Sequence, residues 1–139
     1  GDLSQRKMNT PVRIWDTTAK RMIYPQEGGK QAIFLTMDGR PIQHRGNHLA
    51  LLDGVEVMQM STLISSDRRR LYEQDICDID IPNEYGSCLK GRGVVVFKEL
   101  GWCIAIVQPK IGLHEDYDIS HIEYRGNVHE NPELLKETP

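Results

Sequence analysis

Residues 75–81 have the sequence DICDIDI, in which acidic and apolar side chains alternate. A period of two residues is typical of a β-strand, because successive side chains of a strand point to opposite faces. The pattern places Ile76, Asp78 and Asp80 on one face and the remaining apolar side chains on the other. A face that mixes charged and apolar side chains predicts an edge strand or a strand of a small barrel.

The sequence after this stretch predicts a β-hairpin. Two apolar runs, at residues 94–97 and 102–107, flank the short segment Glu99-Leu100-Gly101, which fits a hairpin loop. We therefore expect a small closed barrel from about Leu71 to Val128. Its core should include Ile79, Val95, Phe97, Cys103 and Ile104. If Phe97 is buried there, its replacement by alanine should reduce stability by roughly 3–5 kcal/mol.

The first half also contains short strand-like segments. Residues 12–15 and 21–24 predict a hairpin, and residues 32–37 precede the turn dipeptide Asp38-Gly39. Residues 55–60 alternate and predict a further strand, residues 44–48 and 82–93 predict loops, and residues 49–52 fit either a strand or a helical turn. Near the C-terminus, Asn131 followed by Pro132 predicts the start of a helix with Asn131 as its N-cap. Short strands separated by turn signals exclude a helical bundle and indicate a mainly β protein.

Composition limits the function classes. The chain has 139 residues and a net charge of −3, so it lacks the strong basic excess typical of proteins that bind nucleic acid through phosphates. It has no run of 18 apolar residues, which excludes a membrane-spanning helix. Its three cysteines have no CxxC spacing, and the N-terminus lacks the apolar stretch of a signal peptide. Reduced thiols and a cytoplasmic location are therefore expected.

No motif predicts catalysis or a cofactor. His44 and His48 have a metal-ligand spacing, but Gly46 and Asn47 disfavour the helix that would place both rings on one face. The acidic clusters at residues 75–80 and 114–118 lack the pattern of a calcium-binding loop. The glycines form neither of the common nucleotide-binding motifs. We therefore expect no catalytic residue, no cofactor and no metal.

Four segments in order resemble the YopX family of bacteriophage and prophage proteins. They are residues 12–24 (VRIWD through KRMIY), residues 58–76 (MQ through LYEQDI), residues 93–97 (GVVVF) and residues 126–135 (GNVHENPELL). Their order and spacing cover most of residues 12–136. Thr62, Arg68 and Gln74 stand where the family usually has glycine, which puts the tight-turn geometry near Arg68 in doubt.

The resemblance implies an SH3-like barrel in the second half, a phage or prophage origin and self-association. It implies no particular activity. The expected organisation is a disordered N-terminus (1–10), a β-rich subdomain (11–60), an SH3-like barrel (61–130), and a short helix with a tail (131–139).

Three functional hypotheses follow. The first is a non-enzymatic accessory protein of the bacterial host cytoplasm that binds a protein partner, a second copy of itself included. The second is a weak nucleic-acid-binding module that uses Arg68–Arg70, Lys90 and Arg92, and the third is an unrecognised metal-dependent enzyme. Net charge favours the first over the second, and the lack of a catalytic motif argues against the third. The candidate partner-binding residues are Arg68, Arg69, Arg70, Tyr72, Glu73, Trp15, Met58 and Met60.

Overall fold

The computed structural model is mainly β. It describes residues 12–24, 33–38, 40–45, 48–82, 86–99, 101–108 and 119–136. The predicted disordered N-terminus, residues 1–10, and the acidic cluster at residues 114–118 lie outside these ranges. The chain divides into two compact units, residues 1–60 and residues 61–139. In the described ranges, no helix has the length and apolar character needed to span a membrane.

The first unit contains the predicted N-terminal hairpin. Strand β1 (Val12–Asp16) pairs antiparallel with β2 (Arg21–Ile23) on one side and with β6 (Val55–Ile64) on the other. Asp16 closes the hairpin, because its carboxylate accepts hydrogen bonds from the backbone N–H groups of Thr18 (3.0 Å) and Ala19 (2.9 Å). An aspartate that bonds to the backbone two residues ahead is a common turn device. The sheet order is β2-β1-β6-β7, with β7 at Arg70–Tyr72.

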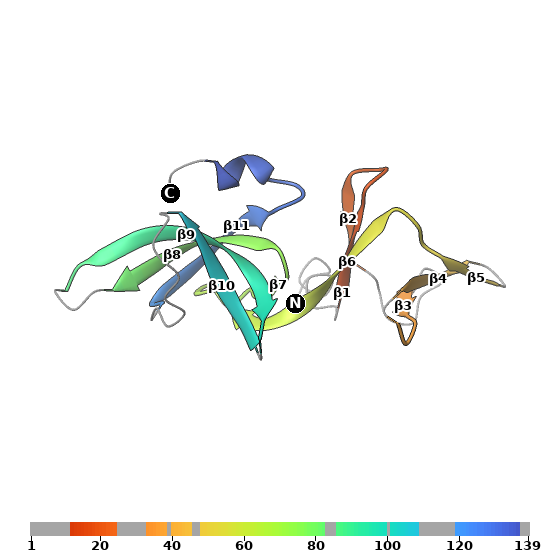
Figure 1. Ribbon diagram of the computed structural model, residues 1–139, viewed down its shortest axis with the longest axis horizontal. Helices are drawn as coiled ribbons and strands as arrows, with labels where there is room; N and C mark the ends of the chain where they lie inside the picture. Colours follow the sequence, from red (N-terminus) through yellow and green to blue (C-terminus); the bar gives the residue numbers. More distant parts are fainter. Residues whose placement is uncertain are drawn as a thin grey trace. The chain divides into compact units, whose positions relative to one another are not determined.

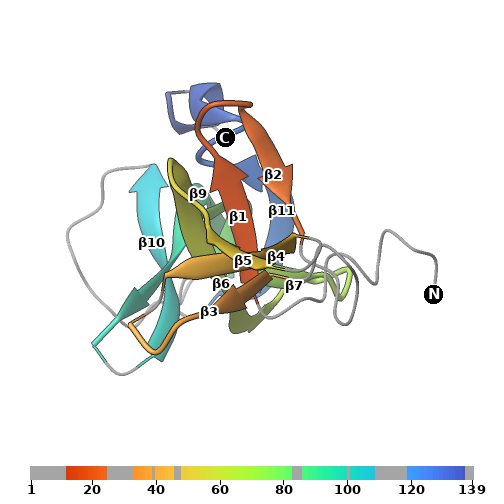
Figure 2. The same cartoon turned by 90° about the vertical axis from the view of Figure 1, so that its right-hand side faces the viewer.

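A second, three-stranded sheet follows in the first unit and can be traced in Figure 2. It consists of β3 (Ile33–Leu35), β4 (Pro41–Arg45) and β5 (His48–Leu51), all antiparallel. The predicted loop at residues 44–48 is therefore wrong at both ends, because His44 and Arg45 belong to β4 and His48 begins β5. Residues 49–52, which fitted either a strand or a helical turn, lie mostly in β5.

The second unit is built on one curled sheet, shown in Figure 1, with the order β10-β9-β8-β11. Its strands are β8 (Asp75–Pro82), β9 (Cys88–Lys98), β10 (Gly101–Gln108) and β11 (His121–Asn127). The predicted hairpin of residues 94–107 is confirmed as β9 and β10. The sheet forms a half-barrel rather than a fully closed barrel. Strand β8 lies between β9 and β11, so it is an interior strand and not an edge, and the predicted loop at residues 82–93 instead contains the start of β9.

The core of the second unit lies on the inner face of this sheet. Its buried members are Leu71, Cys77, Ile79, Ile81 and Val95, and Trp102, Ile104 and Tyr124 pack against them.

Phe97 is not a core residue, since it is 56% exposed and forms an edge-to-face pair with Trp102 at a ring distance of 5.1 Å. It follows Val95 on the same face of β9, but it lies near the hairpin end, beyond the buried cluster. The large stability loss expected for Phe97→Ala therefore does not apply.

The predicted C-terminal helix is a single 3-10 turn, η1 (Pro132–Leu135). Asn131 precedes it but makes no side-chain capping bond to it. Its side-chain Oδ1 instead accepts a hydrogen bond from the backbone N–H of Asn127 at 3.2 Å, which directs the amide back toward β11. Asn131 therefore occupies the predicted N-cap position, but its side chain does not cap the turn, because it bonds to the preceding segment instead.

Candidate functional site

Paired charges cover the outer face of the half-barrel, opposite to the core. The first row joins three strands, because Asp78 on β8 is the register partner of Arg92 on β9 and of Glu123 on β11. In the second row, Asp80 is the register partner of Lys90 and His121. We call these six residues the charged ladder: Asp78, Asp80, Lys90, Arg92, His121 and Glu123.

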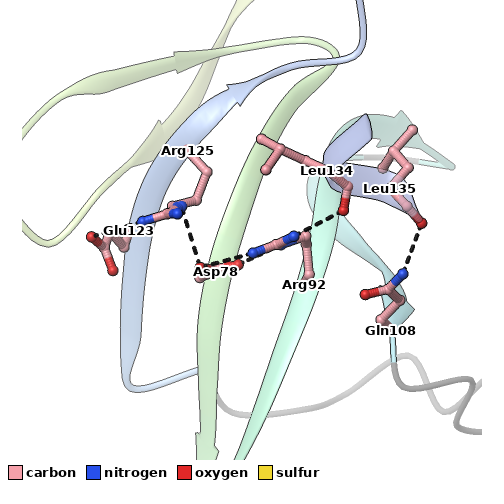
Figure 3. A network of polar contacts seen from close by, with 7 residues as sticks. All are labelled: Asp78, Arg92, Gln108, Glu123, Arg125, Leu134 and Leu135. Carbon is pink, nitrogen blue, oxygen red and sulfur yellow. Dashed lines mark hydrogen bonds and ion pairs between the residues drawn. The ribbon is translucent and has the colours of Figure 1, made fainter. Parts of the chain in front are cut away.

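Arg92 is the best-anchored member of the charged ladder. Its side chain is only 4% exposed. Its Nε donates to Asp78 Oδ1 at 2.6 Å and its Nη2 to Asp78 Oδ2 at 3.3 Å, a two-point contact that fixes both side chains. Its Nη1 donates to the carbonyl oxygen of Leu134 at 2.9 Å, so Arg92 also fastens η1 to the sheet (Figure 3).

A second arginine reaches the same carboxylate. Strand β11 has an irregular register between Tyr124 and Gly126, and Arg125 lies at this bulge. The Arg125 Nε lies 3.4 Å from Asp78 Oδ2, and its Nη1 lies 3.9 Å from Glu123 Oε1. A β-bulge changes the direction of the side chains next to it. Arg125, at this bulge, is the second cation beside Asp78.

The second row is more exposed to solvent. Lys90 Nζ donates to Asp80 Oδ1 at 2.7 Å, and this hydrogen bond raises the pKa of Lys90 above its ordinary value of 10.5. The Lys90 side chain is 68% exposed, so the pair contributes little to stability. The row therefore presents a charged but locally neutral surface.

A groove of about 340 Å³ lies along the charged ladder. Its lining combines three carboxylates, one ammonium group and one imidazole, and two of the carboxylates, Asp78 and Asp80, pair with cations of the neighbouring strand β9. In the described ranges, no three His, Cys, Asp or Glu side chains are placed to share one metal ion. The groove thus offers both donors and acceptors of hydrogen bonds, and it is lined by Asp78, Ile79, Asp80, Lys90, Gly91, His121 and Glu123.

The segment that follows β11 is held by its own side chains. Asn127 is 1% exposed, and its Oδ1 accepts from the N–H groups of His129 (3.0 Å) and Glu130 (2.9 Å). Its Nδ2 donates to Glu130 Oε1 at 2.8 Å. A Cβ atom on Gly126 would meet Asn131 Oδ1 at 2.3 Å, so glycine is required at that position by the packing of Asn131. The segment GNVHENPELL therefore has a structural role, because its side chains hold the turn that follows β11.

The predicted partner-binding residues of the second unit differ in burial and in their contacts, so they do not form one common surface. Tyr72 is buried at 2% exposure, and its N–H donates to Asp75 Oδ2 at 2.7 Å. Arg69 stacks on Tyr124, with its guanidinium carbon 3.5 Å from the ring centroid. Arg70 donates to the carbonyl oxygen of Ser61 at 3.4 Å. Arg68 is exposed, and the neighbouring Glu73 is half-buried.

The predicted partner-binding residues of the first unit are mostly internal. Met58 is fully buried, Trp15 is 9% exposed, and Met60 is half-buried. These side chains already contribute to the packing of the chain, so the apolar surface available to a partner lies on other residues.

The sequence did not predict the charged ladder: Asp78, Asp80, Lys90 and Arg92 belonged to separate hypotheses, and His121 and Glu123 belonged to none. The acidic strand predicted an edge strand, and Lys90 and Arg92 belonged to the nucleic-acid-binding hypothesis. The available signal was the matched spacing: Asp78 and Asp80 are two residues apart, as are Lys90 and Arg92, so each pair would lie on one face of a strand. Antiparallel pairing of such segments brings opposite charges together.

Comparisons with known proteins agree with this architecture. The model of the family described as YopX protein matches residues 12–136. Among solved structures, protein yopX from Bacillus subtilis has a TM-score of 0.56 at 19% identity, and the match covers 95% of this chain and 100% of that chain. Protein EF1440 from Enterococcus faecalis has a TM-score of 0.52 at 19% identity, covering 90% of this chain and 96% of that chain. None of the curated proteins matches the sequence. At this identity the solved structures establish the fold alone.

Proposed function

The chain belongs to the YopX family, and on that basis we propose that it is a non-enzymatic protein-binding module that can also bind a second copy of itself. It acts as a phage or prophage accessory protein in the cytoplasm of the bacterial host cell. The observation that carries the proposal is an apolar face on the three-stranded sheet of the first unit. We call it the leucine face and define it by Leu49, Leu51 and Ile42.

The register of the sheet places these three side chains together. Leu49 and Leu51 lie two residues apart on β5, so they point to the same side, and Ile42 on β4 is the register partner of Leu51. Leu49 is 60% exposed and Leu51 is 48% exposed. A three-stranded sheet needs one covered apolar face for stability, and a contiguous exposed apolar surface on a small protein marks an interaction site.

The charge distribution supports a protein partner over nucleic acid. Of the residues in the predicted basic patch, Lys90 pairs with Asp80 and Arg92 pairs with Asp78. Arg69 stacks on Tyr124. Arg70 bonds to the Ser61 carbonyl oxygen, so four of the five predicted cations interact within the chain, and Arg68 is exposed. The net charge of the chain is −3. Binding through phosphate contacts needs exposed, unneutralised cations.

Solution mass measured by light scattering at several concentrations tests the proposal. We expect the mass to rise above the 15.9 kDa of the single chain. The double variant Leu49→Ser/Leu51→Ser should associate less, because it removes apolar surface from the contact. Ile64→Ser is the matched control, since Ile64 is 47% exposed and lies outside the leucine face. Association that the double variant leaves unchanged would contradict the proposal, as would a monomer at every concentration.

A further inference from the structure

We infer that strand β10 (Gly101–Gln108) is a second, independent interaction surface, which pairs antiparallel with β10 of another copy of this chain. The inference concerns the backbone edge of the half-barrel in the second unit. It does not depend on the leucine face, which belongs to the first unit.

Strand β10 ends the sheet order β10-β9-β8-β11. In the described part of the chain, its backbone hydrogen bonds run to β9. Alternate residues of an antiparallel edge strand direct their N–H and C=O groups away from the sheet. Strand β10 therefore presents a row of backbone donors and acceptors that another strand can satisfy.

The sequence of β10 lacks the usual protection of an edge. It reads GWCIAIVQ, without a charged residue or a proline over eight residues. Protein edges are normally protected by charges, prolines, bulges or covering segments, because an unprotected edge recruits other strands. The register irregularity between Ile106 and Gln108 affects only one end of β10.

The opposite edge strand of the same sheet, β11, is protected by charged residues and by a covering segment. Strand β11 carries His121, Glu123 and Arg125, and it contains the bulge at Tyr124–Gly126. Its outer edge is also closed, because Ser66 N–H donates to the Ile122 carbonyl oxygen (2.8 Å) and Ile122 N–H donates to Ser66 Oγ (2.9 Å). Both edge strands contain a register irregularity, so the two ends of the sheet differ in charge and in cover.

This difference decides which edges of the sheet can pair between two copies of the chain. A head-to-tail arrangement would need β11 as the acceptor edge, and Ser66 already closes it. Pairing of β10 with β10 of a second copy is the arrangement that remains for this sheet. It brings no like charges together, and its two-fold symmetry closes at two copies.

Ala105 allows a direct test, because it is an exposed residue within β10. The variant Ala105→Lys should raise the dissociation constant of the dimer roughly tenfold or more, since it places a charge on each of the two paired edges. Ala105→Thr is the neutral control and should still dimerise. Thr62→Lys adds the same charge at an exposed position on β6 and should leave the mass unchanged.

Light scattering and backbone hydrogen exchange on the full chain separate the outcomes. Concentration-dependent protection of β10 amides, lost in Ala105→Lys, supports the pairing. A mass that falls in Leu49→Ser/Leu51→Ser but not in Ala105→Lys overturns the β10 pairing and leaves the leucine face in place. The reverse result retains the β10 pairing and removes the leucine face. A monomer at every concentration overturns both.

Discussion

Besides Glu99 (φ 57°), two non-glycine residues in the described part of the second unit hold left-handed backbone conformations, Arg68 with φ 69° and Gln74 with φ 72°. Both stand at positions where the family pattern has glycine. The turn at Arg68 is present although glycine is absent, because Arg68 itself adopts the left-handed conformation. Arg68 N–H donates to the Ser65 carbonyl oxygen at 2.9 Å, and Gln74 N–H donates to that of Val95 at 2.8 Å.

Restoring glycine at Arg68 should therefore stabilise the protein. A left-handed conformation costs an L-residue roughly 1–2 kcal/mol, and the more flexible unfolded glycine returns part of that gain. We expect Arg68→Gly to raise the free energy of unfolding by about 0.5–1 kcal/mol in urea titrations.

Thr62 provides the matched control for Arg68→Gly. It also replaces a family glycine, but it lies in β6 and does not hold a positive φ. Thr62→Gly should lower stability, because glycine weakens the interior of a strand. A stabilising effect of equal size at both positions would show that backbone conformation is not the cause.

The three free cysteines differ in burial and should differ in reactivity. Cys77 is fully buried, Cys103 is half-buried and Cys88 is exposed. Burial, together with the nearby carboxylates of Asp75 and Asp78, raises the pKa of the Cys77 thiol to about 12. The reactive thiolate of Cys77 is therefore scarce at pH 8.

We expect Cys88 to react first with a thiol reagent at pH 8 and Cys77 to react only after unfolding. Mass spectrometry of the labelled native protein measures the order, and labelling in denaturant shows that all three thiols are available. Rapid labelling of Cys77 in the folded protein would contradict the buried position of β8.

At the scale of the elements, Arg92 joins three segments. Removing its guanidinium leaves Asp78 with Arg125 as its one neighbouring cation among the described residues, and it leaves the Leu134 carbonyl oxygen without this donor. We expect Arg92→Met to lower the free energy of unfolding by about 1–3 kcal/mol, since buried polar groups lose their partners. Chemical denaturation measures the loss.

Lys90→Met is the control in the neighbouring row of the charged ladder. Lys90 pairs with Asp80 at the surface, so its removal should change stability very little. Equal losses for the two variants would mean that the contact to η1 contributes nothing to the role of Arg92.

The turn between β6 and β7 should respond to acid. Ser65 Oγ–H donates to the Asp67 carboxylate, and this hydrogen bond lowers the pKa of Asp67 below 3.8. A smaller desolvation of the carboxylate acts in the opposite direction and raises its pKa. A lowered pKa in the folded state stabilises the protein at neutral pH, and this contribution is lost as the pH falls through the folded-state pKa. Ser65→Ala should move the pKa of Asp67 upward.

Denaturation of Ser65→Ala from pH 7 to pH 2 checks this prediction. Its stability difference from the unsubstituted protein should shrink as the pH falls below 3.8, although loss of the Oγ contact to Arg69 N–H remains at all pH values. Ser66→Ala is the control, because Ser66 Oγ accepts from Ile122 rather than bonding a carboxylate. Its stability difference should stay nearly constant over the same range.

For the whole molecule, local alternation was enough to predict the β class and most strands. The segment of residues 75–81 and the hairpin of residues 94–107 were recognisable because side-chain period and turn residues agree there. Residues 88–93 contain two glycines, two cations and only one large apolar residue, so propensity favoured a loop. Pairing with β8 makes this segment a strand, since each residue from Cys88 to Val94 has a register partner there.

The candidate site was less predictable, because it depends on register. The charged ladder exists only when β8 lies between β9 and β11, and sequence periodicity does not specify neighbours. Similarly, the exposure of Leu49 and Leu51 depends on what covers β5, which composition does not reveal. The expectation that Met58 and Tyr72 bind a partner identified important apolar residues, and the structure places both in the interior.

The contact between Gly126 and Asn131 has an evolutionary consequence. The Asn131 side chain fills the space that any β-carbon at position 126 would need, with the closest approach at 2.3 Å. The same side chain accepts the Asn127 N–H, so it cannot move away without losing that bond. The two positions should therefore covary. Homologues that keep asparagine at 131 should keep glycine at 126, and alanine or serine at 126 should occur only together with a smaller residue at 131.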